Sequence, residues 1–209
     1  MNYKSLYQSK NLNPGTYIVR TIIAFLTKMF EANADFGFTV YTDELSKEDS
    51  FRALLITSKY DWETKYRSKR PSILVSRGNV SRGSFGTQGM GKVLSITENG
   101  NLTSYTDLIS VPIVIECLSE NDVEAEVLSA IVQTFLALDV RPLQSFGIQI
   151  QQPPVQSPAL LVEKANVTFI SSVIMTLAMQ IQYRSHTLSG PLLEEFKMMV
   201  NNSTEIHVK

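Results

Sequence analysis

The residues most suggestive of chemistry are 86–93, which read G-T-Q-G-M-G-K-V and match seven of the eight positions of a phosphate-binding P-loop. A P-loop requires a helix after it, because the helix N-terminus directs free N–H groups at the phosphates. Here Val93 replaces the Ser or Thr that would hold Mg²⁺, and residues 93–97 alternate as in a strand. We therefore interpret residues 78–92 as a long, glycine-rich contact loop and expect no nucleotide or other cofactor.

Residue types that support metal binding or nucleophilic catalysis are sparse in this sequence. His186 and His207 are the two histidines and Cys117 is the one cysteine, without Cys-x-x-Cys or His-x-x-x-His spacing. This composition provides no ligand set for a transition metal, so we expect surface imidazoles and a core cysteine. No Gly-x-Ser-x-Gly motif is present. Four carboxylates between residues 120 and 126 fall at the start of an expected helix, where they complement its dipole. We predict that the protein is not an enzyme.

Charge is distributed unevenly along the chain, although the formal net charge is −1. Residues 59–92 contain eight basic and two acidic residues, whereas residues 93–140 contain eight acidic residues and no Lys or Arg. Regions of opposite charge on opposite sides of a molecule attract a second copy of it. The candidate interface residues are Trp62, Tyr66, Arg67, Lys69, Arg70, Arg77, Arg82, Lys92, Glu120, Asp122, Glu124 and Glu126.

Two aromatic residues, Trp62 and Tyr66, lie among the basic residues of this block. Aromatic and basic side chains together can anchor a protein interface or stack on single-stranded nucleic acid. Because no known nucleic-acid-binding motif accompanies them, we favour a protein interface, with nucleic-acid binding as the alternative.

The elements that would position these residues begin with a helix over 14–32, with Asn13 as its N-cap and Pro14 at its first position. We expect strands near 38–41, 51–57 and 72–76, a hairpin of 93–97 with 102–105, and a strand over 107–117. An approximate capping box of Ser119 and Asp122 opens a helix over 121–138. Its expected apolar face comprises Val123, Val127, Leu128, Ile131, Phe135 and Leu138.

The last third of the chain is expected to be mostly strand. A strand over 146–151 precedes a loop over 152–158, because three prolines disfavour regular pairing there. Residues 167–183 alternate between apolar and polar, so this long strand must bend, be interrupted or project from the domain. A short helix over 191–200 and a loose tail follow.

This order of elements predicts an α+β fold, a mostly antiparallel sheet packed by two main amphipathic helices, with long loops and a short C-terminal helix. We expect an N-terminal arm over 1–13, one domain over 14–184 and a C-terminal extension over 185–209. No apolar run reaches the roughly 18 residues of a membrane-spanning helix, and the first residues lack the apolar centre of a signal peptide. A single cysteine suits a reducing cytoplasm.

The order of these parts resembles the tail-terminator (tail-completion) proteins of long-tailed bacteriophages. The resemblance covers about residues 14–184, and the segments that carry it are FRALLITSK, KRPSILVSRGN, the ENGN hairpin, SVPIVIECLS, ENDVEAEVLSAIVQTFLAL and NVTFISSVIMTLAMQIQYRS. It implies a structural virion protein that forms a ring, usually a hexamer, at the head-proximal end of the tail. Such a ring stops the addition of tube subunits and presents a surface to the head connector.

The resemblance also implies the partners and the location. The partners would be other copies of the chain, the major tail-tube protein, the head connector or stopper, and in contractile tails the sheath. From the residues themselves we expect no membrane partner and disfavour nucleic acid, which stays the alternative partner. The protein would reside in the tail or neck of the virion, after assembly in the host cytoplasm. Another neck or head-completion ring is an alternative position for the same residues.

Overall fold

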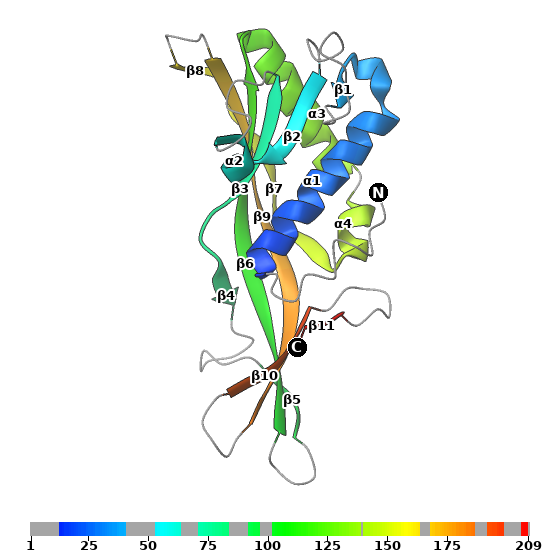
Figure 1. Ribbon diagram of the computed structural model, residues 1–209, viewed down its shortest axis with the longest axis vertical. Helices are drawn as coiled ribbons and strands as arrows, with labels where there is room; N and C mark the ends of the chain where they lie inside the picture. The colour runs from blue at the N-terminus through cyan, green and yellow to red at the C-terminus, as the bar shows by residue number, and fades with distance from the viewer. Residues whose placement is uncertain are drawn as a thin grey trace.

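The computed structural model describes residues 13–40, 53–63, 71–83, 92–96, 102–138, 140–163, 168–186, 192–198 and 206–208. They form an α+β fold, as the sequence predicts, in which a mixed and mainly antiparallel sheet packs against two main helices (Figure 1). These helices are α1 (Pro14–Ala32) and α3 (Asp122–Leu138). The shorter helical segments are η2 (Ala34–Phe36), α2 (Lys59–Asp61) and α4 (Arg141–Ser145).

Two long antiparallel strands form the spine of the sheet. Strand β6 (Leu102–Ser119) pairs with β9 (Thr168–His186) along its whole length. At about 3.4 Å per residue, 18 paired residues extend about 60 Å. In Figure 1 the lower ends of both strands extend beyond α1 and α3. Of the three outcomes predicted for the long C-terminal strand, projection is therefore the one observed.

Short strands line both edges of this spine. Along β6 lie β3 (Ser72–Arg77), β4 (Ser81–Gly83) and β5 (Lys92–Ile96), and along β9 lie β8 (Leu160–Glu163), β7 (Ile148–Gln156) and β10 (Leu192–Met198). Strand β2 (Ala53–Ser58) pairs in parallel with β3, β1 (Thr39–Val40) pairs in parallel with β2, and β11 (Ile206–Val208) pairs with β10. The parallel pair β2–β3 requires a crossover connection, which begins with α2.

The core lies between one face of the sheet and the two main helices. Helix α1 begins as predicted, because the Asn13 side chain accepts a hydrogen bond from the Gly15 N–H at 2.9 Å. The rings of Phe30 on α1 and Phe135 on α3 meet edge to face at 5.3 Å and join the two helices. Cys117 is fully buried in this core, as predicted. We call the sheet face under these helices the inner face and the opposite one the outer face.

Helix α3 begins one residue later than predicted and ends where predicted, but it has a different buried face. Leu128 and Phe135 are buried as expected, whereas Val123, Val127 and Leu138 are exposed. The residues that replace them in the core are Ala125, Ser129, Val132 and Leu136. The prediction was wrong because this helix is apolar on several sides, so that apolar spacing does not select one face.

The N-cap of α3 also differs from the prediction. Asn121, rather than Ser119, caps the helix, since its side-chain oxygen accepts a hydrogen bond from the Val123 N–H at 2.8 Å. The Ser119 hydroxyl instead donates to the Glu124 carboxylate and accepts from the Asn121 N–H at 3.1 Å.

Several strand predictions also need correction. The expected segments 102–105 and 107–117 form the single strand β6. Strand β7 continues through Pro153 and Pro154, although proline has no N–H group to donate to a neighbouring strand. The register of β7 on β9 shifts beside these prolines, so the pairing does not require an N–H group from either of them. In place of the expected terminal helix and loose tail, β10 and β11 continue the sheet, because their backbone groups pair with β9 and with each other.

The glycine-rich region is only partly a loop. Strand β4 forms within it, and β5 begins at Lys92, opposite Thr106 of β6. The remainder, residues 84–91, lies outside the described residues. The strand predicted immediately after the P-loop-like motif is confirmed, so this motif lacks the following helix that phosphate binding requires.

Candidate assembly interface

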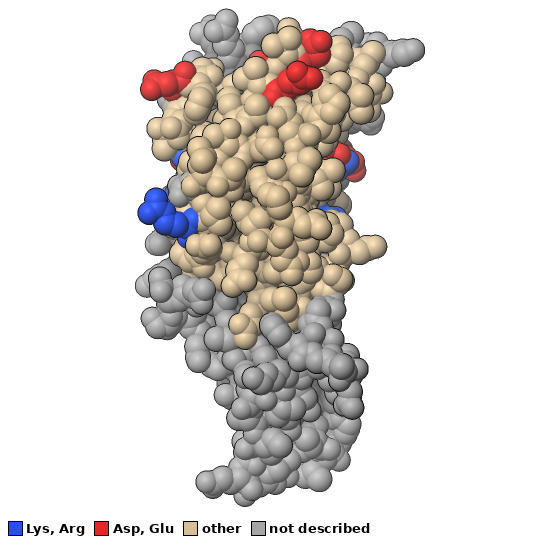
Figure 2. Space-filling view, turned by 180° about the vertical axis from the view of Figure 1, so that it is seen from behind, with Lys and Arg blue, Asp and Glu red and all other residues tan. Residues whose placement is uncertain are grey.

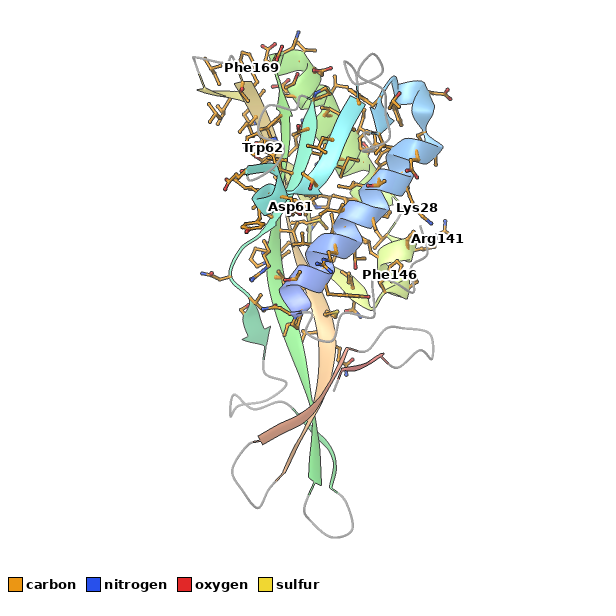
Figure 3. The ribbon with its side chains drawn as sticks, viewed as in Figure 1. Lys28, Asp61, Trp62, Arg141, Phe146 and Phe169 are labelled. Atoms are coloured by element: carbon orange, nitrogen blue, oxygen red, sulfur yellow. The ribbon has the colours of Figure 1, made fainter. Side chains whose placement is uncertain are left out.

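The predicted basic and aromatic residues are only partly described by the structure. Trp62 follows α2, is half-buried and lies beside Asp61 at one margin of the sheet (Figure 3). Arg77 is exposed at the end of β3, with its side chain close to Gly15 at the start of α1. The backbones of Arg82 and Lys92 lie in β4 and β5. Outside the described residues are Tyr66, Arg67, Lys69 and Arg70.

The four predicted acidic residues do lie together, around the first turns of α3. Glu120, Asp122 and Glu126 are exposed, and Glu124 is half-buried and accepts from Ser119. Glu126 also accepts a hydrogen bond from the Ala159 N–H at 3.1 Å, which joins α3 to the start of β8. In the space-filling view, acidic side chains lie near the upper end of the molecule and most of the remaining described surface is uncharged (Figure 2).

The exposed side of α3 is unusual for a helix surface because it carries few charges. The exposed side chains that follow Glu126 along this helix are all uncharged, whereas a solvated helix face is normally polar and charged. Their spacing places them opposite the buried residues, so they point away from the sheet. Val123, Val127 and Leu138 are 46 to 80% exposed. We call this surface the helix stripe, and it comprises Val123, Val127, Ala130, Thr134, Ala137 and Leu138.

The outer face of the sheet carries a second exposed apolar surface, on β7, β8 and β9. Val155 of β7 pairs with Ile174 of β9, and Leu160 of β8 pairs with Ile170 of β9. Ile170 and Ile174 are separated by an even number of positions on β9, so both pairs lie on the same face of the sheet. Val155, Leu160 and Ile174 are 50 to 63% exposed. We call these three residues the sheet patch. On an antiparallel sheet with one solvated face, outward positions are normally polar, so this patch departs from the expected alternation.

Another part of the outer face is covered. Leu74 points outward from β3 but is 1% exposed, and helix α2 packs against β3. The Lys59 ammonium at the start of α2 lies 2.8 Å from the Glu116 carboxylate of β6 and forms an ion pair on the outer face. Helix α2 therefore lies on the β3 side of the outer face, whereas no described helix lies over the sheet patch on the β7–β9 side.

A buried polar network fixes the position of α3 relative to the strands that carry the sheet patch. The Ser129 hydroxyl lies 2.6 Å from the Ser171 hydroxyl, which donates to the Ser157 carbonyl oxygen at 2.7 Å. The Gln156 side-chain amide donates to Ser129 at 2.6 Å. Ser129 and Ser171 are fully buried, so these hydrogen bonds satisfy groups that have no access to water.

Sequence reasoning missed both apolar surfaces. The signal for the helix stripe is present in the sequence, since α3 has no charged residue after Glu126. The signal for the sheet patch is weaker, because Ile170 and Ile174 are the two large apolar residues in a described series of outward positions on β9 that is otherwise polar or small.

The remaining observations concern kinds of site that the described residues do not form. No described cluster of three or more His, Cys, Asp or Glu residues could hold a metal ion. Within the described part of the chain, no helix is both long enough and apolar enough to cross a membrane. In comparisons with known proteins, no protein-family profile and no curated protein sequence matches this chain.

Proposed function

We propose that this protein is a structural virion component that forms a ring at the head-proximal end of a phage tail, where it ends tube or sheath polymerisation and joins the tail to the head connector. The observation that carries the proposal is the pair of exposed, uncharged apolar surfaces, the helix stripe and the sheet patch. Monomeric soluble proteins rarely expose large contiguous apolar surfaces, and such surfaces mark contact sites with other macromolecules. The resemblance in the order of elements supports the position in the tail.

The geometry favours contacts with protein over contacts with nucleic acid. The charged residues beside the helix stripe are all acidic, namely Glu120, Asp122 and Glu126. Phosphate binding requires the opposite charge, so a nucleic acid would be repelled from this side. An apolar centre with a charged rim is instead the usual composition of a protein interface.

The test is assembly of purified tail-tube subunits in the presence of this protein, with the tube protein taken from a gene adjacent to its own. We expect negative-stain microscopy to show rings at one end of short tubes, and we expect tube length to fall as the ratio of this protein to tube subunit rises. Tubes of unchanged length without an added ring would refute the proposed place in the tail. Retardation of DNA in a gel shift that falls steeply with salt would support the nucleic-acid alternative.

A further inference from the structure

We infer that the helix stripe of one copy of this chain packs against the sheet patch of a second copy, in a repeating head-to-tail contact. This inference rests on the self-assembly in the proposed function and names the surfaces that meet. The starting observation is that the two surfaces point in opposite directions. The buried side of α3 faces the inner face of the sheet, so the helix stripe points away from the sheet, whereas the sheet patch lies on the outer face.

Each surface has the chemistry that the other one needs. A sheet with one apolar face exposed is stabilised when a helix covers that face, and an apolar helix stripe is stabilised when it lies on a sheet. Helices α1 and α3 satisfy this requirement on the inner face, but no described main helix covers the sheet patch on the outer face. A second copy would supply that helix.

Charge argues against a symmetric contact between two helix stripes. Asp122 and Glu126 lie beside the stripe and are exposed, so two stripes facing each other would bring like charges together. The residues of the sheet patch are uncharged, so a helix stripe that packs on the patch does not place its acidic neighbours against a second acidic rim.

The direction of the contact determines the kind of assembly. When the contact joins two different surfaces, a row of copies has a free helix stripe at one end and a free sheet patch at the other. Further copies can therefore add until the ends meet in a ring, or the row grows into a filament. The opposed directions of the stripe and the patch satisfy this condition. A symmetric contact would stop at a dimer.

The size of the contact predicts its strength. A 17-residue helix is about 25 Å long and about 10 Å wide, so its footprint is about 250 Å² on each partner. This area is well below the roughly 800 Å² on each partner of a standard specific interface. A single joint should therefore be weak and depend on protein concentration, and closure of a ring, in which every copy makes two joints, would stabilise it further.

The experiment uses two variants that each disable one surface, Val127→Asp on the stripe and Val155→Asp on the patch. Both side chains are largely exposed, so the fold should tolerate the substitutions, and circular dichroism with thermal unfolding verifies this. Gln144→Asp on the exposed side of α4 is the matched control. Analytical ultracentrifugation over a concentration series should show association of the wild-type chain and the control, and at least about 30-fold weaker association of either variant alone.

Mixing the two variants provides the decisive comparison. Each variant retains one intact surface, so an equimolar mixture should form a one-to-one dimer and nothing larger. Monomers in the mixture, or association of either variant at the wild-type strength, would overturn the inference. Formation of this dimer by a protein that never associates with tail tubes would leave the inference standing and refute the proposed function.

Discussion

The hydroxyl pair of Ser129 and Ser171 provides a quantitative test of how α3 is held on the sheet. Both residues are fully buried, and their oxygen atoms are 2.6 Å apart. The Gln156 amide donates to Ser129, and Ser171 donates to the Ser157 carbonyl oxygen. The Ser129 hydroxyl lies within hydrogen-bond distance of both the Ser171 hydroxyl and the Glu126 carbonyl oxygen, the latter at 2.9 Å. Ser129→Ala removes the central member and leaves the buried Ser171 hydroxyl without this neighbour, whereas the half-buried Gln156 amide keeps the Glu126 carbonyl oxygen at 3.2 Å.

The expected cost follows from the burial of these groups. A buried polar group that loses its partner costs about 1–3 kcal/mol, so Ser129→Ala should lower the free energy of unfolding by about 2 kcal/mol. For a chain of this size the Tm should fall by about 4–8 °C, at about 2–4 °C for each kcal/mol. Chemical denaturation and calorimetry measure both quantities. The double variant Ser129→Ala with Ser171→Ala should cost less than the sum of the single variants, because the two residues share one hydrogen bond.

Ser145→Ala is the matched control for this prediction. The Ser145 hydroxyl also makes a hydrogen bond, to the Pro142 carbonyl oxygen at 2.6 Å, but it is exposed, so water can replace its partner. Its loss should change the free energy of unfolding by less than about 0.5 kcal/mol. Equal effects of Ser129→Ala and Ser145→Ala, or strict additivity of the two buried substitutions, would refute the reasoning.

Three further predictions concern single residues. Asn13→Ala removes the side-chain cap of α1 and should destabilise the fold by about 1 kcal/mol in chemical denaturation, and Asn13→Asp, which restores an acceptor, should recover most of this loss. Burial raises the pKa of the Cys117 thiol, so the folded state favours the neutral thiol. The resulting stabilisation of the folded state is complete below the unfolded pKa of about 8.5 and is lost as the pH rises above it. A pH series of unfolding free energies should therefore decline less steeply above this pH for Cys117→Ala than for the wild-type chain, and identical slopes would contradict the assignment. Because the strand β5 begins at Lys92, calorimetry with ATP and Mg²⁺ should detect no binding, and micromolar affinity that Lys92→Ala abolishes would reverse the interpretation of the P-loop-like motif.

The sequence predicts the elements whose signals are local. Asn13 and Pro14 mark the start of α1 because capping depends on adjacent residues, and the Asn-containing turn predicts the β5–β6 hairpin for the same reason. The α+β class follows from these elements. The acidic residues between 120 and 126 are also grouped correctly, since one helix start holds them together.

The errors arise where tertiary pairing overrides the local signal. Residues 192–198 have no strong alternation, but β9 extends far enough to pair with them as a strand. Pro153 and Pro154 argue against a strand locally, but the register shifts of β7 accommodate them. The orientation of α3 depends on which side meets the sheet, and an apolar helix does not encode that side in its spacing. The sequence shows that α3 lacks charge after Glu126, but the direction of the helix stripe depends on the packing of α3, and the sheet patch depends on the pairing of β7 and β8 with β9.

The contact between helix stripe and sheet patch can be tested most directly by crosslinking between copies. On a Cys117→Ala background, Val127→Cys with Val155→Cys places one thiol on each surface of the same chain. With a short bismaleimide reagent, we expect the double variant to give a ladder of covalent oligomers, and an equimolar mixture of the two single variants to give a crosslinked dimer. Crosslinks confined to each single variant alone would show a symmetric contact, and an absence of crosslinks at concentrations where the chain associates would contradict the head-to-tail joint.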